Sequence, residues 1–314
     1  MRADTAGPEP EADIEFEGDG AVKVTEGDHP VANEPAPYHE RYYLLYHGTQ
    51  VPSQLDLQGT LDFLTGLGYA GGELEQARRG KDVAEQIERT YNPKKRGAHF
   101  CDFCGVEIVG AESEVLKDGR ERCMNCGRTA IRTEEEFRSL YQSVLRGMAS
   151  FYGVRITVPI QVKMVNAKRL HRRLGKTFVP TGNPDGRVLG VAIRDKDGYS
   201  ILVENGAPRM AAVTTMAHEM THIWQYLNWD AGQIRDLYGK DRELEIYEGM
   251  AKWSEIQYAY LMGEPAIAKR EEILTRLRDD EYGRGFLMYV GRYPLSEGTR
   301  LEGDTPFDDK TRPL

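Results

Sequence analysis

Cysteine is scarce in this chain: four occur among 314 residues, and all four lie between positions 101 and 126. This clustering excludes a disulfide framework spread over the chain and favours a metal cluster in a reducing compartment. No apolar run approaches the roughly 18 residues that a membrane-spanning helix needs. Residues 1–20 lack a basic region followed by an apolar stretch, so no secretory signal is expected. We therefore expect a cytoplasmic protein with no membrane partner.

Positive charge is also in the minority. Lys and Arg total 41 against 50 Asp and Glu, which gives a net charge of −9. Such a balance provides no global basic field, and no nucleic-acid partner is expected. The length, together with 40% hydrophobic residues, is enough for one large domain or two modest ones.

The two ends of the chain differ from its middle. Residues 1–37 contain ten acidic residues, two basic residues and five prolines, a composition that predicts a disordered acidic tail. Residues 38–97 are predicted to form a small region of unknown role, with a strand over 42–46 and a weak helix over 72–90. Residues 298–314 are predicted to form a polar C-terminal tail.

Residues 131–297 have the pattern of an α+β domain. Thr133 and Glu136 have the spacing of a capping box, and apolar residues then recur at helical spacing as far as Gly153. The pattern that follows predicts, in order, a strand over 154–165, a polar loop over 166–186, strands over 187–193 and 199–203 joined by a turn, and helices over 207–228 and 242–262.

The four cysteines form two CxxC pairs, Cys101 with Cys104 and Cys123 with Cys126. Each pair can place two thiolates on one tight turn, and two such turns complete a tetrahedral zinc site. The 18 residues between the pairs lie within the range of known four-cysteine sites. We predict a structural zinc module over residues 98–130, with two short hairpins between the CxxC pairs, over residues 106–122; a redox role for the CxxC pairs is the weaker alternative.

The second motif is HExxH, formed by His218, Glu219 and His222. On an α-helix, residues four apart share a face, so both imidazoles can reach one cation. Glu219 lies beside that face, where it can hold a metal-bound water. Two histidines packed without a metal are the alternative interpretation.

A catalytic zinc site needs a third protein ligand and an open position for water. Glu248 is the best candidate, because it begins an apolar helical stretch and is followed by Gly249, which allows two helices to approach. Glu255 lies two turns further on and is expected to be displaced by ~10 Å along the helix axis. An exposed carboxylate with no metal is the alternative for Glu248.

HExxH followed by Glu-Gly on a later helix resembles the gluzincin metallopeptidases. A closer likeness lies in the order of the metal motifs along the chain. The two CxxC pairs flank residues 116–120, and they are followed by residues 207–210, 217–224, 248–249 and 282–286. This order resembles the plant LIM-domain, ubiquitin-activated zinc peptidases that limit organ growth, the "DA-one" family, over roughly residues 98–290. The resemblance implies a zincin-like (gluzincin) peptidase domain at 131–297, preceded by a zinc-ribbon or LIM-like module.

The resemblance also implies site residues and partners. His218, His222 and Glu248 would hold a catalytic zinc, Glu219 would be the general base, and a protein or peptide would be the substrate. Ubiquitin or a ubiquitin-like protein would be a further partner. However, the stretch 73–77 lacks the serine that follows it in ubiquitin-interacting helices.

The proposed reaction is hydrolysis of a peptide bond by a zinc-bound water that Glu219 activates. The tetrahedral oxyanion needs a further donor, for which Tyr282 is the first candidate and Tyr247 and His171 are weaker ones. By analogy with the folds that the chain resembles, the strand 199–203 is expected to be the edge strand that aligns the substrate. Two alternatives remain: a non-enzymatic adaptor, and a peptidase inhibited by its own N-terminal region.

Overall fold

The computed structural model describes residues 12–24, 43–46, 49–52, 62, 64–66, 70, 99–104, 107–108, 112–178, 180, 188–310 and 314. The strands are β1 (Ala12–Phe16), β2 (Val22–Val24), β3 (Tyr43–Tyr46), β4 (Thr49–Pro52), β5 (His99–Phe100), β6 (Glu107–Ile108), β7 (Ser113–Val115), β8 (Glu121–Cys123), β9 (Ile160–Val165), β10 (Gly190–Asp195) and β11 (Gly198–Glu204). The helices are α4 (Met124–Arg128), α5 (Glu134–Tyr152), α6 (Ala167–Arg173), α7 (Arg209–Asn228), α8 (Ala231–Tyr238), the 3-10 helix η1 (Lys240–Arg242), α9 (Glu243–Leu261), α10 (Pro265–Arg276) and α11 (Glu281–Arg292). Together they form the expected α+β arrangement.

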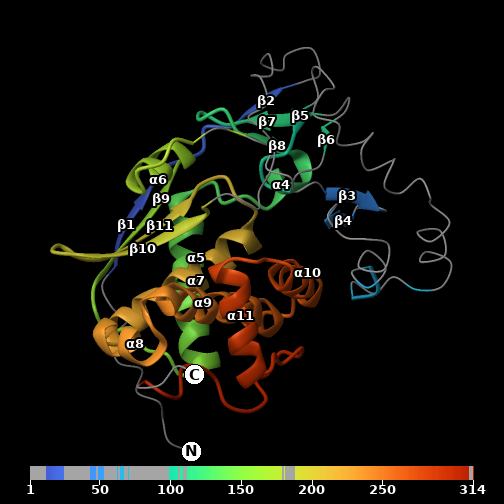
Figure 1. Cartoon of the computed structure of the whole chain (residues 1–314). Helices are drawn as coiled ribbons and strands as arrows, with labels where there is room; N and C mark the ends of the chain where they lie inside the picture. The colour runs from blue at the N-terminus through green and yellow to red at the C-terminus, as the bar shows by residue number, and fades with distance from the viewer. Residues whose placement is uncertain are drawn as a thin grey trace, which may run out of the picture.

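A four-stranded sheet in the order β1-β9-β11-β10 forms one side of the larger domain, and helices α5 and α7 lie against it (Figure 1). Strands β1, β9 and β11 run parallel to one another, whereas β10 is antiparallel to β11 and lies at the edge. Alternate residues such as Val162 and Ile201 are fully buried against the helices. These residues form the face of the sheet on the main core; on the opposite face, Leu202 of β11 is also buried, in a smaller cluster with Leu170 of α6.

The predicted disorder of residues 1–37 is wrong for residues 12–24. Strand β1 pairs in parallel with β9, and β2 pairs with β7 of the cysteine module. The physical reason is the apolar alternation within the acidic segment: Ile14 and Phe16 pack against the core, and Phe16 lies 6.2 Å from Phe137 between ring centroids. The remaining residues of the predicted tail lie outside the described residues.

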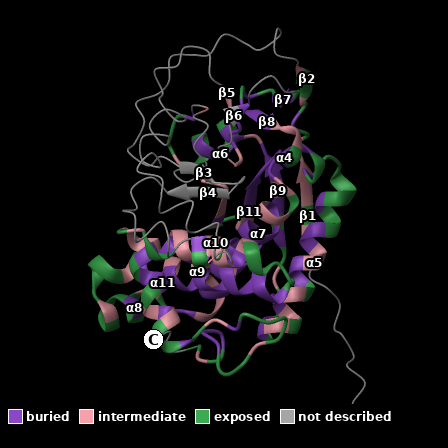
Figure 2. Cartoon of the chain, turned by 90° about the vertical axis from the view of Figure 1, so that its right-hand side faces the viewer, coloured by how far each residue is buried: buried purple, intermediate pink, exposed green. Residues whose placement is uncertain are grey.

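Helix α7, which carries the HExxH motif, is surrounded by other elements. Every residue from Ala212 to Gln225 is buried, and most of α7 and α9 has the colour of buried residues in Figure 2. Helix α9 packs between α7 and α11. Gly249 permits the contact with α11, because a Cβ there would lie 2.4 Å from the backbone carbon of Gly285. The predicted close approach of two helices at Gly249 is observed, with α11 as the partner.

The helix that follows Thr133 has its predicted boundaries and its capping box. The strand predicted over 154–165 forms at Ile160–Val165. Within the predicted polar loop 166–186, the structure instead contains α6, with Asn166 accepting a hydrogen bond from the Arg169 amide as its N-cap. Helices α8, α10 and α11 were also missed. The predicted helix over 72–90 lies outside the described residues.

The predicted polar tail after residue 297 is wrong for its described part. Phe307 is buried, stacks on Tyr152 at 4.9 Å and meets Trp224 edge-on at 5.1 Å between ring centroids. The carbonyl of Leu314 accepts a hydrogen bond from the Tyr238 hydroxyl at 2.9 Å. One aromatic side chain within a polar stretch thus anchors the C-terminus to the core, and the domain extends past residue 297.

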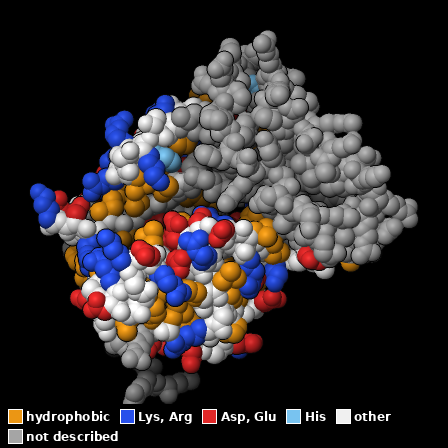
Figure 3. Space-filling view, viewed as in Figure 1, with side chains coloured by type: hydrophobic (Ala, Val, Ile, Leu, Met, Phe, Trp, Pro, Cys, Tyr) orange, Lys and Arg blue, Asp and Glu red, His pale blue; other side chains and the backbone are white. Residues whose placement is uncertain are grey.

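Lys and Arg side chains gather over α6 in an otherwise mixed surface (Figure 3). Arg169, Arg172, Arg173 and Lys163 line a hollow of about 550 Å³ together with two aspartates of the β10–β11 turn. Part of this charge is compensated, because Glu15 pairs with Lys163 and Arg169. No helix within the described ranges is both long enough and apolar enough to cross a bilayer.

Candidate metal centres

Helix α7 points the two motif histidines at α9. His218 and His222 lie one turn apart on the same face, and their Nε2 atoms are 3.2 Å from each other. Each is 8% exposed, so the imidazoles meet inside the protein near its surface. The predicted convergence of the two histidines is observed.

Glu248 of α9 supplies the third donor. Its Oε2 atom lies 3.2 Å from Nε2 of His218 and 3.4 Å from Nε2 of His222. The three donor atoms therefore form a nearly equilateral triangle, and all three ligand atoms lie within 4.8 Å of one another. The histidines hold the pKa of the Glu248 carboxyl far below its usual range, against the opposing effect of burial. Glu248 is thus an ionised donor in a group that can hold a metal ion.

The second nitrogen of each histidine is held by a side chain that sequence reasoning did not assign. Nδ1 of His218 lies 3.1 Å from Oε2 of Glu255, and Lys252 donates to the same carboxylate at 3.0 Å. Nδ1 of His222 lies 2.8 Å from Oε1 of Gln225, whose amide donates to the Tyr247 carbonyl at 2.9 Å. Such partners fix the orientation and the tautomer of metal-binding imidazoles.

Glu255 was predicted to lie too far along the axis to share the ligand site with Glu248. The seven-residue separation places both carboxylates on one face of α9, two turns apart. His218 lies between them, with Nε2 towards Glu248 and Nδ1 towards Glu255. Because of this displacement, Glu255 contacts the outer nitrogen of His218 and does not join the three donor atoms of the candidate metal site.

Glu219 is buried between the centre and the edge strand β10. The backbone N–H of Ala192 faces its carboxylate. A Cβ at Gly190 would lie 2.7 Å from Oε1 of Glu219 and 2.6 Å from Thr215, so β10 can pass this close because Gly190 has no side chain. Burial raises the pKa of Glu219, while the charges of both histidines and the Ala192 N–H lower it. Glu219 is positioned next to the predicted metal and next to a strand edge.

The predicted edge strand is the wrong one of the hairpin. Strand β11 lies inside the sheet, between β9 and β10, so its backbone groups pair on both sides. The edge beside the HExxH helix is β10. The prediction followed sequence order, in which β11 is nearer to α7. In the fold, the strand that lies at the edge of the sheet and contacts α7 is β10.

Two phenol rings lie against the histidines. The ring centroid of Tyr282, on α11, lies 6.2 Å from that of His218, and the ring centroid of Tyr226 lies 6.4 Å from that of His222. Burial and the charges of Glu219 and Glu248 raise the pKa of Tyr226 to about 12, and the same three causes raise that of Tyr282 still further. Tyr226 was not predicted, although it lies four residues after His222 on the same helix face.

The two weaker candidates are not brought to the centre. Tyr247 packs its ring edge-on against Trp229 at 5.2 Å. His171 lies on α6, whose Leu170 packs with Leu202 on the face of the sheet opposite to α7. Its Nδ1 lies 3.0 Å from the Ala167 carbonyl, and its ring contacts Phe178. His171 is a structural residue of that helix.

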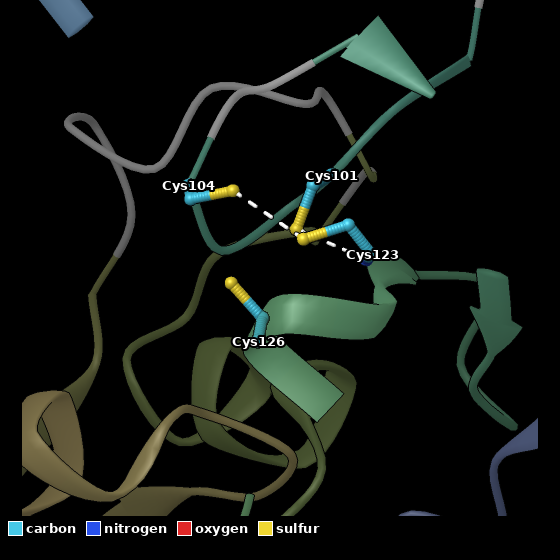
Figure 4. A group of neighbouring side chains, drawn as sticks. All are labelled: Cys101, Cys104, Cys123 and Cys126. Carbon is cyan, nitrogen blue, oxygen red and sulfur yellow. Dashed lines mark hydrogen bonds between the residues drawn. The ribbon is translucent and has the colours of Figure 1, made fainter. Parts of the chain in front are cut away.

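The four cysteines converge as the second group (Figure 4). Cys101 and Cys104 come from the turn after β5, Cys123 ends β8, and Cys126 lies on α4. The sulfurs of Cys104 and Cys123 are 3.7 Å apart, the amide of Cys123 donates to the Cys101 sulfur at 3.3 Å, and none of the four forms a disulfide. Of the two hairpins predicted over residues 106–122, β7–β8 lies within that stretch. Strand β6 pairs instead with β5, which precedes the first CxxC pair, so this hairpin encloses the pair and is not the predicted one.

Two buried arginines connect this module to the start of α7. Arg120 forms ion pairs with Asp118 and Glu204, and it donates to the Asn205 carbonyl at 2.8 Å. Arg122 pairs with Asp19 at 2.7 Å and donates to the Gly206 carbonyl at 2.7 Å. Both guanidinium groups are fully buried. The chain between β11 and α7 is thereby held by side chains of the cysteine module.

Comparison with known proteins adds nothing to this geometry. No family model matches the chain, and no similar curated protein or solved structure was found.

Proposed function

We propose that the chain is a zinc-dependent peptidase that cleaves peptide bonds in protein substrates. The observation that carries this proposal is the triangle of His218, His222 and Glu248 with Glu219 buried beside it. Two imidazoles and one carboxylate are a ligand set typical of catalytic zinc, and the fourth position of such a site takes water or substrate.

The donor spacing fits zinc. Ligands about 2.0–2.1 Å from a tetrahedral zinc ion lie about 3.3 Å from one another, and the three separations here are 3.2, 3.2 and 3.4 Å. In a four-thiolate site, zinc–sulfur bonds of about 2.3 Å imply sulfur atoms about 3.8 Å apart, close to the 3.7 Å between Cys104 and Cys123. We assign a catalytic role to the first site and a structural role to the second.

When bound, zinc would supply a Lewis acid and lower the pKa of a bound water. The chain's own residues would do the rest. Glu219 would accept a proton from the attacking water and deliver it to the leaving amine. Tyr226 or Tyr282 would donate to the oxyanion, since both rings lie on the histidines. Glu255 and Gln225 would keep both Nε2 atoms directed at the zinc.

The edge strand β10 would align the substrate. A peptide that adds to this edge would place its backbone beside Glu219, and main-chain hydrogen bonds would supply much of the affinity. The close passage of β10 at Gly190 supports this assignment. The alternative of a non-enzymatic adaptor requires neither the buried Glu219 nor the open strand edge.

The decisive experiment compares Glu219→Gln with the wild-type protein. The variant should still hold two zinc ions per chain but lose peptide cleavage by at least about a thousandfold, because the general base is removed while the ligands stay. His222→Ala should lose one zinc ion together with activity. Glu135→Gln, at an exposed position of α5, serves as the matched control. Undiminished cleavage by Glu219→Gln would refute the proposal.

A further inference from the structure

A cation lies beside the candidate catalytic centre, on the strand that borders it. Arg194 is exposed near the end of β10, with its guanidinium 5.2 Å above the Tyr226 ring, and that ring stacks on His222. One guanidinium nitrogen donates to the Tyr226 carbonyl at 3.1 Å. Arg194 is therefore separated from a predicted zinc ligand by a single aromatic ring.

The backbone of β10 shows which way this residue faces. The N–H of Glu204 in β11 donates to the Leu189 carbonyl at 2.8 Å, so the antiparallel pairing alternates from there and the polar groups of Ala192 point away from β11. In an antiparallel pair, this outward direction recurs at every second residue, which places the N–H and C=O of Arg194 on the same open side. Its side chain shares the sheet face of Ala192, towards α7.

The direction of a bound peptide follows from the same pairing. Antiparallel addition to an edge is the more stable arrangement. In that arrangement, residues before the scissile bond lie beside the later part of β10. Because Arg194 is two residues beyond Ala192, the substrate residue opposite Arg194 lies about two positions before the residue at Ala192. Opposed side chains of an antiparallel pair share a face and contact each other.

The charge of Arg194 is not neutralised within the part of the chain that the structure describes, where no carboxylate lies within ion-pair distance of it. Its neighbours differ in this respect, since Arg173 pairs with Asp195 on the other face of the sheet and Arg235 pairs with Glu243. A guanidinium has five N–H donors and matches a carboxylate in a planar, two-bond geometry. One of these donors is used on the Tyr226 carbonyl.

We propose that Arg194 determines specificity, favouring substrates with an acidic side chain about two residues before the scissile bond. This inference rests on the proposed peptidase function and adds a substrate class to it. A purely structural role is the competing explanation, because a cation near the end of a helix also stabilises that helix. The test must therefore measure selectivity and not activity alone.

The experiment uses the full-length, zinc-loaded protein and a mixture of peptides of natural composition, with cleavage sites read by mass spectrometry. Wild-type protein should cut sites with Asp or Glu at the proposed position about fivefold more often than neutral sites. Arg194→Glu should reverse this preference, so that Lys and Arg are favoured there, and the ratio of acidic to basic sites should fall at least about tenfold. Lys196→Glu makes the same charge change in the adjacent turn and should leave the ratio unchanged.

The outcomes separate the two proposals. If the wild-type protein cleaves peptides without an acidic preference, or if Arg194→Glu keeps that preference, the role of Arg194 is refuted and the peptidase function stands. A preference for acidic residues after the scissile bond also refutes the role of Arg194, because the peptide would then run parallel to β10. If no peptide in the mixture is cut, both proposals fail. If Arg194→Glu reverses the charge preference, both proposals are supported. A variant that had only lost stability would not begin to cleave sites with Lys or Arg at this position.

Discussion

The two candidate metal centres of this chain are built in opposite ways. The four cysteines lie within 26 positions and are brought together by short hairpins and one helical turn. The second centre joins α7 to α9, and its supporting side chains come from both helices. Four thiolates complete a tetrahedral shell, whereas three donors leave one position open. A local, closed site suits stabilisation, and a long-range, open one suits chemistry.

The largest expected effect is the loss of the closed site. Cys126→Ser removes a buried sulfur of the proposed zinc site, and a structural zinc site contributes on the order of 10 kcal/mol of metal-coupled folding free energy. We expect one zinc ion per chain to be lost, the cysteine module to unfold and the free energy of unfolding to fall. Metal analysis and limited proteolysis measure this. His222→Ala should lose the other ion and stay folded; equal unfolding by both variants would contradict the comparison.

The next largest effect is expected from breaking the ion pairs that connect the two centres. Arg120→Met removes a fully buried cation and leaves Glu204 and Asp118 without it. Breaking a buried ion pair in this way costs about 3–5 kcal/mol, which denaturant unfolding measures. Arg138→Met is the control, because its pair with Glu134 is half-exposed and contributes about 0.5 kcal/mol or less. Equal costs for the two variants would mean that the buried pairs do not hold the module in place.

A smaller effect is expected behind the open site. Glu255→Gln keeps the shape of the side chain but removes the charge that faces Nδ1 of His218. Loss of such a partner lowers metal affinity about 10- to 100-fold, which competition with a chelating dye measures. Glu243→Gln, on the same helix and paired with Arg235, should bind zinc like the wild type. An unchanged affinity in Glu255→Gln would show that this contact does not support the metal.

The smallest effect concerns pH. Burial lowers the pKa of His218, but the hydrogen bonds that its imidazole donates to the Glu248 and Glu255 carboxylates outweigh burial and raise it to about 10 in the metal-free chain. At pH 7 the imidazole therefore carries a proton that zinc must displace. Affinity at the open site should rise about tenfold per pH unit near neutrality for each proton released. Calorimetry in buffers of different ionisation enthalpy counts these protons; a heat that does not depend on the buffer would contradict the assignment.

Much of both centres could be predicted from local spacing. The CxxC pairs, the two histidines and the helix that follows Thr133 depend on contacts within a few residues, which the sequence displays directly. Strand β1 was missed because its apolar residues lie within an acidic segment and its partner β9 lies about 150 residues away. Helix α6 was missed because it is short and basic, and Phe307 was missed because one aromatic residue carries no periodicity.

The sequence by itself determined which side chains can bind metal and which of them share a helix face, because backbone periodicity places residues four apart on one side. Only the tertiary structure decided that Glu248 would meet the histidines, that Glu255 and Gln225 would hold their other nitrogens, and that β10 would be the open edge. These pairings depend on how α9 and the sheet pack around α7. Packing depends on the shapes of all the contacting surfaces together, which no local pattern contains.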